Sequence, residues 1–339
     1  MGMFDKLLAN LRNSRKTIVF TEGLDPRILE ATDRLLKEDL MDVILCGNAE
    51  AVKAIAKECN FNVDKATIID PATYPEFDTM VKTMYELRKG KMTEEECAKS
   101  LAKSNYFGTM LVKMGKADAL LGGATYSTAD TVRPALQIVK TKKGANLVSS
   151  SFILFRKKDG KEEKIAMGDC AINISYQDKL DKDGNVILTA AQQLAEVAVE
   201  TAKTADYFGI DPKVAVLSFS TYGSGKGGTV QLSHDAVIEA RKLNPDLVID
   251  GEFQFDAAVS PVVAKTKCPD SKVAGQANTF IFPLIEAGNI GYKIAQRLGG
   301  YEAYGPILQG LNAPINDLSR GCNADEVYKM AIITAGMAE

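Results

Sequence analysis

The feature that most constrains the fold is a regular alternation of short apolar segments with amphipathic helical segments in the N-terminal part of the chain. Four apolar segments have the length of buried strands, at residues 17–20, 42–46, 66–69 and 118–121. Helices are predicted between them, over about 26–37 after Asp25 and over 49–58 after Asn48. Strands and helices in this rhythm form parallel sheets with right-handed crossovers, so the sequence predicts an α/β fold with a doubly wound sheet. Ligands of such sheets bind beyond the carboxyl ends of the strands.

The pattern changes after residue 141, which indicates a second domain. A β-type run over 147–155, a charged turn over 156–164 and a second run from Ile165 predict a hairpin, hence a local antiparallel pair. A last helix is predicted over about 324–337 and is too short to form a domain alone. A chain of 339 residues has the length of about two domains. We expect two doubly wound α/β domains, a discontinuous one of residues 1–146 plus 306–339 and a second of residues 147–305.

The composition excludes several classes of function. Basic residues number 41 and acidic residues 44, a balance that argues against a general polyanion binder such as a nucleic-acid-binding protein. The single histidine, His234, cannot supply a metal site that needs two or three histidines, and every histidine-based triad would have to include it. The six cysteines include no CxxC pair, which suits a reducing cytoplasm. There is no signal-like segment, and the uncharged runs fall well short of the roughly 20 residues of a membrane helix, so we expect a cytoplasmic protein.

A glycine motif offers a dehydrogenase interpretation. Gly223, Gly225 and Gly228 match GxGxxG, and Asp250 lies about 20 residues on, where a nicotinamide ribose partner is expected. Four residues separate this motif from the preceding strand, whereas the dinucleotide fingerprint follows its strand closely. We therefore predict a flexible glycine-rich loop and keep a nicotinamide-dependent dehydrogenase as the alternative from a different class. His234 has helical spacing and charged neighbours, which predicts a solvated helix residue.

A cluster before the last helix predicts an anion site. The run from Asn316 to Cys322 places the hydroxyl of Ser319 and the guanidinium of Arg320 immediately before a helix start. An alternative stays open here, because Asn323 and Glu326 have the spacing of a capping box, which would give Glu326 a purely structural role.

A second polar cluster follows the strand that ends at Gly122 and Gly123. Hydroxyl residues that include Ser127 and Thr131 come next, and Arg133 follows them in a helix. This segment could cradle a phosphate, because glycine lets the backbone approach while the hydroxyls and the arginine donate hydrogen bonds. Arg88 would add a third cation if the fold brings it near.

Several long blocks in the same order make the chain similar to the phosphate acetyltransferases (phosphotransacetylases). The blocks are TIVFTEGLDPRILEA (17–31), ADALLGGATYSTADTVRPALQIVKT (117–141), DGEFQFDAA (250–258), ANTFIFPLIEAGNIGYKIAQRLGG (277–300) and GPILQG followed by NDLSRGC (305–322). The resemblance implies an architecture like that of isocitrate and isopropylmalate dehydrogenases, with the active site in a cleft between two domains, and a homodimer. It implies reversible transfer of an acetyl group between acetyl phosphate and coenzyme A, with coenzyme A as a substrate, no metal and no permanently bound cofactor.

The resemblance also implies roles for residues around the SRGC motif. Ser319 and Arg320 would contact acetyl phosphate. The family's base, an aspartate that deprotonates the thiol of coenzyme A, falls on Glu326, with Asp325 one position before it. The usual Glu-Asp order is thus reversed, so the base is either Glu326 with its longer arm or Asp325 after a small shift. A chain that binds coenzyme A but has lost activity through this exchange is a further alternative.

Other matches and departures concern binding. Arg88 and Arg133 match family arginines associated with coenzyme A or phosphate, and Cys170 matches a cysteine near the family's active site. Residues 174–187 form an insertion, which we interpret as a surface loop near the cleft, and Tyr222 replaces a usual lysine. The acyl length is set by the shape of the pocket, so a relative that prefers propionyl or butyryl phosphate is the alternative within the same class.

Overall fold

The chain folds into two compact units, which are described separately in this computed structural model of residues 2–338. The terminal unit comprises Gly2–Lys143 and the chain from Leu311 onward, and the middle unit comprises Gly144–Gly310. The borders predicted from the sequence were 146/147 and 305/306. The second border falls later because strand β12 (Glu302–Gln309) stays paired with the middle unit's β5 (Ser149–Lys158) as far as Gln309.

The terminal unit is built on a five-stranded sheet in which every pair of neighbouring strands is parallel. The strands are β1 (Thr17–Phe20), β2 (Asp42–Cys46), β3 (Thr67–Ile69), β4 (Ala119–Gly122) and β13 (Ile315–Asp317). Their order is β13-β4-β1-β2-β3, so the chain winds from β1 outward to β3 and then continues on the other side of β1. The switch point of this doubly wound sheet therefore lies between β1 and β4, which is the place where such sheets bind ligands.

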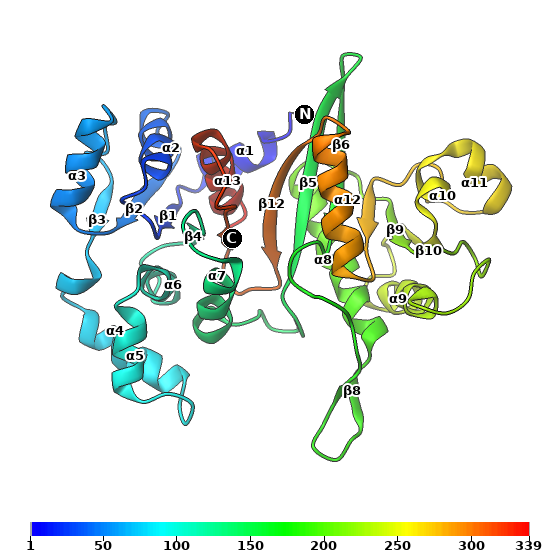
Figure 1. Cartoon of the computed structure of the whole chain (residues 1–339), viewed down its shortest axis with the longest axis horizontal. Helices are drawn as coiled ribbons and strands as arrows, with labels where there is room; N and C mark the ends of the chain where they lie inside the picture. The colour runs from blue at the N-terminus through cyan, green and yellow to red at the C-terminus, as the bar shows by residue number, and fades with distance from the viewer. Residues whose placement is uncertain (1, 339) are drawn as a thin grey trace. The chain divides into compact units, whose positions relative to one another are not determined.

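Helices cover both faces of this sheet, as Figure 1 shows. One face carries α1 (Asp5–Asn13), α2 (Pro26–Lys37) and α13 (Ala324–Gly336), and the other carries α6 (Ser104–Lys113) and α7 (Thr128–Pro134). The remaining elements are α3 (Ala49–Glu58), the 3-10 turn η1 (Pro71–Thr73), α4 (Phe77–Leu87), α5 (Glu94–Leu101) and the π-helical turn η2 (Ala135–Val139). Val19 and Leu120 pack with Phe107 and Met110 of α6 in one buried apolar cluster.

Side-chain caps explain why the predicted helices of this unit begin where they do. Asp25 caps α2 by accepting from the Arg27 N–H, with Pro26 at the first helical position, and Asn48 accepts from the N–H of Ala51 in α3. Each cap accepts a hydrogen bond from a backbone N–H of the first turn, so the helix begins at the next residue. The predicted bounds 26–37 and 49–58 are confirmed.

The middle unit is built on a six-stranded mixed sheet in the order β10-β9-β11-β6-β5-β12. Besides β5 and β12, its strands are β6 (Lys161–Gly168), β9 (Val214–Leu217), β10 (Ile249–Phe253) and β11 (Thr279–Ile281). Its helices are α8 (Ala190–Tyr207), α9 (Val230–Leu243), α10 (Phe255–Val259), α11 (Pro261–Lys267) and α12 (Ile285–Arg297). Alternate residues of β9 serve the two faces: Val214 and Val216 pack toward α8 and α9, and Ala215 and Leu217 pack toward α10 and α11.

Two local expectations for the middle unit need correction, and a third is refined. The prediction of a charged turn over 156–164 is wrong, because β5 and β6 pair as far as Lys158 and Lys161. Opposite charges face each other across the two strands, as in the Arg156–Glu163 ion pair. The apolar run over 247–250 predicts a strand that ends at Asp250, whereas β10 begins at Ile249 and continues to Phe253. The insertion at 174–187 is largely exposed, as predicted for a surface segment, and it carries a small antiparallel pair of β7 (Lys179–Leu180) with β8 (Val186–Leu188).

The helices among residues 2–338 do not meet the requirements of a membrane span. None of them combines the length and the apolar character needed to cross a bilayer.

Candidate active site

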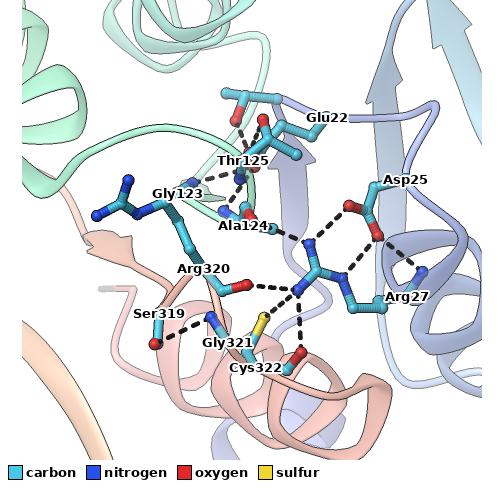
Figure 2. A network of polar contacts seen from close by, with 11 residues as sticks. Glu22, Asp25, Arg27, Gly123, Ala124, Thr125, Ser319, Arg320, Gly321 and Cys322 are labelled. Atoms are coloured by element: carbon cyan, nitrogen blue, oxygen red, sulfur yellow. Dashed lines mark hydrogen bonds and ion pairs between the residues drawn. The ribbon is translucent and has the colours of Figure 1, made fainter.

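The ends of three adjacent strands bring the predicted anion clusters together. Strands β13, β4 and β1 are neighbours, and their last residues lie level: Gly122 pairs with Asp317, and Leu121 pairs with Phe20. The backbone N–H of Leu318 then donates to the carbonyl of Gly122 at 2.7 Å. The loops after these strands therefore meet at the switch point of the sheet, as Figure 2 shows.

The loop after β13 carries the two residues that the sequence singled out for acetyl phosphate. The side chains of Ser319 and Arg320 are exposed, and the backbone N–H of Gly321 donates to Oγ of Ser319 at 3.2 Å. Because this oxygen accepts a hydrogen bond, the hydroxyl proton of Ser319 can be donated to an anion. Arg320, the next residue, carries a guanidinium, a group that binds phosphate oxygens in a fork.

The two candidate bases at the start of α13 differ in what holds them. Asn323 and Glu326 form a reciprocal capping box: Oε2 of Glu326 accepts from the Asn323 N–H at 3.0 Å, and Oδ1 of Asn323 accepts from the Glu326 N–H at 2.9 Å. Asp325 instead forms ion pairs with Lys329 at 2.9 Å and Arg34 at 3.1 Å. The hydrogen bond and charge of Lys329, with those of Arg34, lower the pKa of Asp325 and so weaken it as a base.

The loop after β4 differs from the phosphate cradle that its glycines suggested. The carboxylate of Glu22 occupies the backbone N–H groups of Gly123 (3.0 Å), Ala124 (3.2 Å) and Thr125 (2.5 Å), and it also accepts from the Thr125 hydroxyl at 2.7 Å. Figure 2 shows these bonds converging on one side chain. Glu22 was not among the predicted residues, because only the pairing of β1 with β4 brings it to this loop. In this structure the three N–H groups serve to fix the loop.

A buried carboxylate lies beneath the same loops. Oδ2 and Oδ1 of Asp317 accept from the hydroxyls of Thr128 (2.5 Å) and Thr131 (2.6 Å), which ties β13 to α7. Burial raises the pKa of Asp317 to about 6, against the two threonine hydrogen bonds, which lower it. Thr131 is itself buried, and Asn316 is buried with its amide donating to Thr334 at 2.9 Å. Both residues support the loops from below, and direct contact of either one with a substrate stays a prediction.

The three remaining predicted residues of the terminal unit are Arg88, Arg133 and Ser127. Burial raises the pKa of the Tyr106 phenol, and the charges of Arg133 and Arg88 both act to lower it, so the two arginines lie near this one hydroxyl. Arg133 is exposed, and Nε of Arg88 is buried without a hydrogen-bond partner among the described residues. Ser127 is exposed and its hydroxyl donates to Asp130 at 2.7 Å in the cap of α7.

The last predicted site residue, Cys170, belongs to the middle unit. It is fully buried, and burial, together with the charge of Asp169, raises the pKa of its thiol well above the ordinary value. A thiol in this state is protonated at neutral pH.

The glycine motif of the same unit does not have the surroundings of a nucleotide site. The carboxylate of Asp250 accepts from the hydroxyls of Tyr222 and Ser271 at 2.6 Å each and pairs with Arg241 at 3.2 Å. Backbone N–H groups of the loop are also used within the protein: that of Gly223 donates to Glu252 at 2.7 Å. His234 is an exposed residue of α9, as predicted.

The side chains that commonly bind metals form no candidate metal centre in the described part of the chain. Among residues 2–338, no three or more histidines, cysteines, aspartates or glutamates are grouped so as to hold a metal ion.

Comparison with known proteins identifies the family. The sequence matches the profile of the phosphate acetyl/butaryl transferases over residues 3–335. The chain belongs to this family. It is 53% identical over 321 residues to the phosphate acetyltransferase of Bacillus subtilis (strain 168), an alignment that covers 95% of this chain and 94% of that protein.

Two solved structures extend the comparison to the fold. A phosphotransacetylase from Streptococcus pyogenes superposes with a TM-score of 0.92 at 51% identity, and the match covers 99% of this chain and 98% of that one. The EutD phosphotransacetylase from Staphylococcus aureus superposes with a TM-score of 0.87 at 47% identity and the same coverage. The family resemblance that the sequence blocks predicted is thus confirmed.

Proposed function

We propose that this chain is a phosphate acetyltransferase that moves an acetyl group reversibly between acetyl phosphate and coenzyme A. The observation that carries the proposal is the exposed Ser319–Arg320 pair at the switch point of the terminal unit, in a chain about half identical to phosphate acetyltransferases over nearly its whole length. An exposed hydroxyl and an exposed guanidinium on consecutive residues of one loop suit the phosphate of an acyl phosphate.

The attacking group in this reaction is the thiol of coenzyme A. A thiol with a pKa near 8.5 is only a few per cent ionised at pH 7, so full ionisation costs roughly 2 kcal/mol. We assign the base to Glu326, because the capping box uses Oε2 of its carboxylate and Oε1 accepts no hydrogen bond from the described residues. A well-placed general base contributes a factor of about 10² to 10⁴.

Charge stabilisation is the larger part of the catalysis. Attack of the thiolate on the acetyl carbonyl forms a tetrahedral oxyanion, and collapse of this intermediate releases phosphate. A donor aimed at such developing charge contributes about 3–4 kcal/mol. We assign this role to Arg320 and Ser319, whose donors project from the same loop.

The protonated thiols of the chain favour direct transfer between the two bound substrates. Burial raises the pKa of Cys322 to about 11, with the charge of Arg27 opposing it, and Cys170 is likewise held as a thiol. Neither is poised to take the acetyl group as a thiolate. We therefore propose a ternary complex in which the thiol of coenzyme A attacks acetyl phosphate itself.

The finer features of the resemblance remain part of the proposal. Arg88 and Arg133 would bind the phosphates of coenzyme A, which acts as a substrate, and no permanently bound cofactor is required. We also propose a homodimer, a cytoplasmic location, a place in acetate metabolism and the two-domain architecture of the isocitrate and isopropylmalate dehydrogenases. Light scattering on the purified chain tests the dimer, because a monomeric mass would contradict it.

The test of the function is thioester formation from coenzyme A and a series of acyl phosphates. We expect acetyl phosphate to give the highest kcat/KM. A higher kcat/KM with propionyl or butyryl phosphate would show that the enzyme prefers the longer acyl chain. Coenzyme A binding without thioester formation would indicate an inactive binding protein. Reduction of a nicotinamide by a hydroxy acid, without any thioester, would favour the dehydrogenase.

A further inference from the structure

Arg27 joins the three loops of the site, although the sequence alone predicted no role for it. Its guanidinium is held in a fork by Asp25, from Nε to Oδ1 at 3.0 Å and from Nη2 to Oδ2 at 2.7 Å. Nη2 also donates to the carbonyl of Ala124 at 2.9 Å, and Nη1 donates to the carbonyls of Arg320 at 2.9 Å and Cys322 at 3.0 Å. These five bonds use all five N–H groups of an arginine. Figure 2 shows them radiating from the guanidinium.

Two of these acceptors connect Arg27 to the groups that the proposed function uses. In a trans peptide group the carbonyl and the N–H are coplanar and point in opposite directions. The carbonyl of Arg320 points to Arg27, and the N–H of the same peptide group, on Gly321, donates to Oγ of Ser319 at 3.2 Å. The hydroxyl of Ser319 is therefore oriented by a peptide group that Arg27 holds.

The second peptide group leads to the base. The carbonyl of Cys322 accepts from Arg27, and the N–H of the same peptide group, on Asn323, donates to Oε2 of Glu326 at 3.0 Å. One guanidinium thus fixes the two peptide planes whose N–H groups orient the serine and the glutamate.

We propose that Arg27 is the positioning residue of this site, which sets the Ser319 hydroxyl and the Glu326 carboxylate relative to each other through these two peptide groups. The inference rests on the proposed function, because it needs Ser319 and Glu326 in the roles given above. Glu22 accepts from the N–H of Ala124, and Arg27 donates to the carbonyl of the same residue. The loop after β4 is therefore bound to the same guanidinium.

Lysine is the informative replacement for Arg27. Arg27→Lys keeps the positive charge beside Asp25 but offers three donors in place of five, so the two carbonyls of the 319–322 loop cannot both be held as in the native protein. Asp25→Asn is the second variant: asparagine still caps α2, but its single side-chain oxygen cannot complete the fork to Arg27. The matched control is Arg15→Lys, which alters an exposed arginine paired with Asp39 and Asp42 in the same unit.

The experiment measures kcat and both KM values for thioester formation from acetyl phosphate and coenzyme A, with melting temperatures, in a double-mutant cycle of Arg27→Lys with Glu326→Gln. We expect Arg27→Lys to lower kcat by about 10- to 100-fold with little change in the KM for coenzyme A. In the Glu326→Gln background, Arg27→Lys should lower kcat by a severalfold smaller factor, because the side chain at position 326 no longer acts as a base. Asp25→Asn should lower kcat less than Arg27→Lys does, and its effect should also be smaller in the Glu326→Gln background. Arg15→Lys should have the kcat of the wild type.

Three outcomes would decide against this role. If folded Arg27→Lys keeps a kcat within twofold of the wild type, Arg27 does not position the site. If Arg27→Lys lowers kcat by the same factor in the wild type and in the Glu326→Gln background, Arg27 only supports the fold. If Arg27→Lys does not fold and Asp25→Asn shows no coupling to Glu326→Gln, the inference fails as well. A wild-type chain without transferase activity would refute the proposed function itself, which separates the two failures.

Discussion

Replacement of Asp317 by asparagine should remove a pH dependence of stability that originates beneath the active-site loops. In the folded protein burial raises the pKa of this carboxyl from 3.8 to about 6. An acid with a raised folded pKa stabilises the fold fully below pH 3.8, and this stabilisation is lost as the pH rises through 6. A difference of about 2 pH units at 1.36 kcal/mol per unit gives about 3 kcal/mol. The wild type should therefore lose about 3 kcal/mol of unfolding free energy relative to Asp317→Asn between about pH 4 and pH 8.

Urea unfolding of both proteins at pH 4, 6 and 8 measures this difference, and the pH dependence of all other groups cancels in it. Thr131→Val provides a second check, because the Thr131 hydroxyl lowers the pKa of Asp317 and its removal should increase the total loss of unfolding free energy between pH 4 and pH 8. A difference between wild type and Asp317→Asn that stays constant from pH 4 to pH 8 would refute the argument that burial raises the pKa of this carboxyl.

The remaining predictions concern the chemistry of the loop and of α13. Arg320→Ala should lower kcat/KM for acetyl phosphate by about 10²- to 10³-fold, and a variant with near-normal turnover would remove Arg320 from the mechanism. Glu326→Gln should lower kcat by about 10²-fold or more at an unchanged melting temperature, because glutamine also completes a capping box. Asn323→Ala, which breaks the cap but keeps the carboxylate, should cost about 1 kcal/mol of stability instead; the reverse pattern would make Glu326 purely structural. Cys322, with a pKa of about 11 and a buried side chain, should react slowly with iodoacetamide at pH 8 until urea is added, and rapid alkylation of the native protein would contradict its protonated state.

Local sequence signals predicted several elements of the terminal unit well, because caps and prolines mark helix starts, whereas β13, α4 and α6 were not predicted. Asp25 with Pro26 and the reciprocal pair of Asn323 and Glu326 define helix starts without help from distant residues. The middle unit was harder to predict, because charged residues continue within the β5–β6 pair where a turn was expected. There the cross-strand pairing of opposite charges decides the structure, and spacing along one strand does not show it.

The candidate site was predicted only in part, for a related reason. Ser319 and Arg320 stand together in the sequence, so their loop could be found, whereas Glu22 and Asp317 gain their partners only through the strand order β13-β4-β1. Arg27 did carry a signal. A positive charge in the first turn of a helix opposes the helix dipole, and here the Asp25 carboxylate and backbone carbonyls of the neighbouring loops compensate for it.

The most direct test of the proposed mechanism is the initial rate of thioester formation with acetyl phosphate and coenzyme A both varied. Because the thiols of Cys170 and Cys322 are held protonated, we predict transfer within a ternary complex, and double-reciprocal plots that intersect. Parallel lines would show an acetylated enzyme intermediate, and the absence of any thioester would show that the chain does not catalyse the reaction; either result would contradict the mechanism.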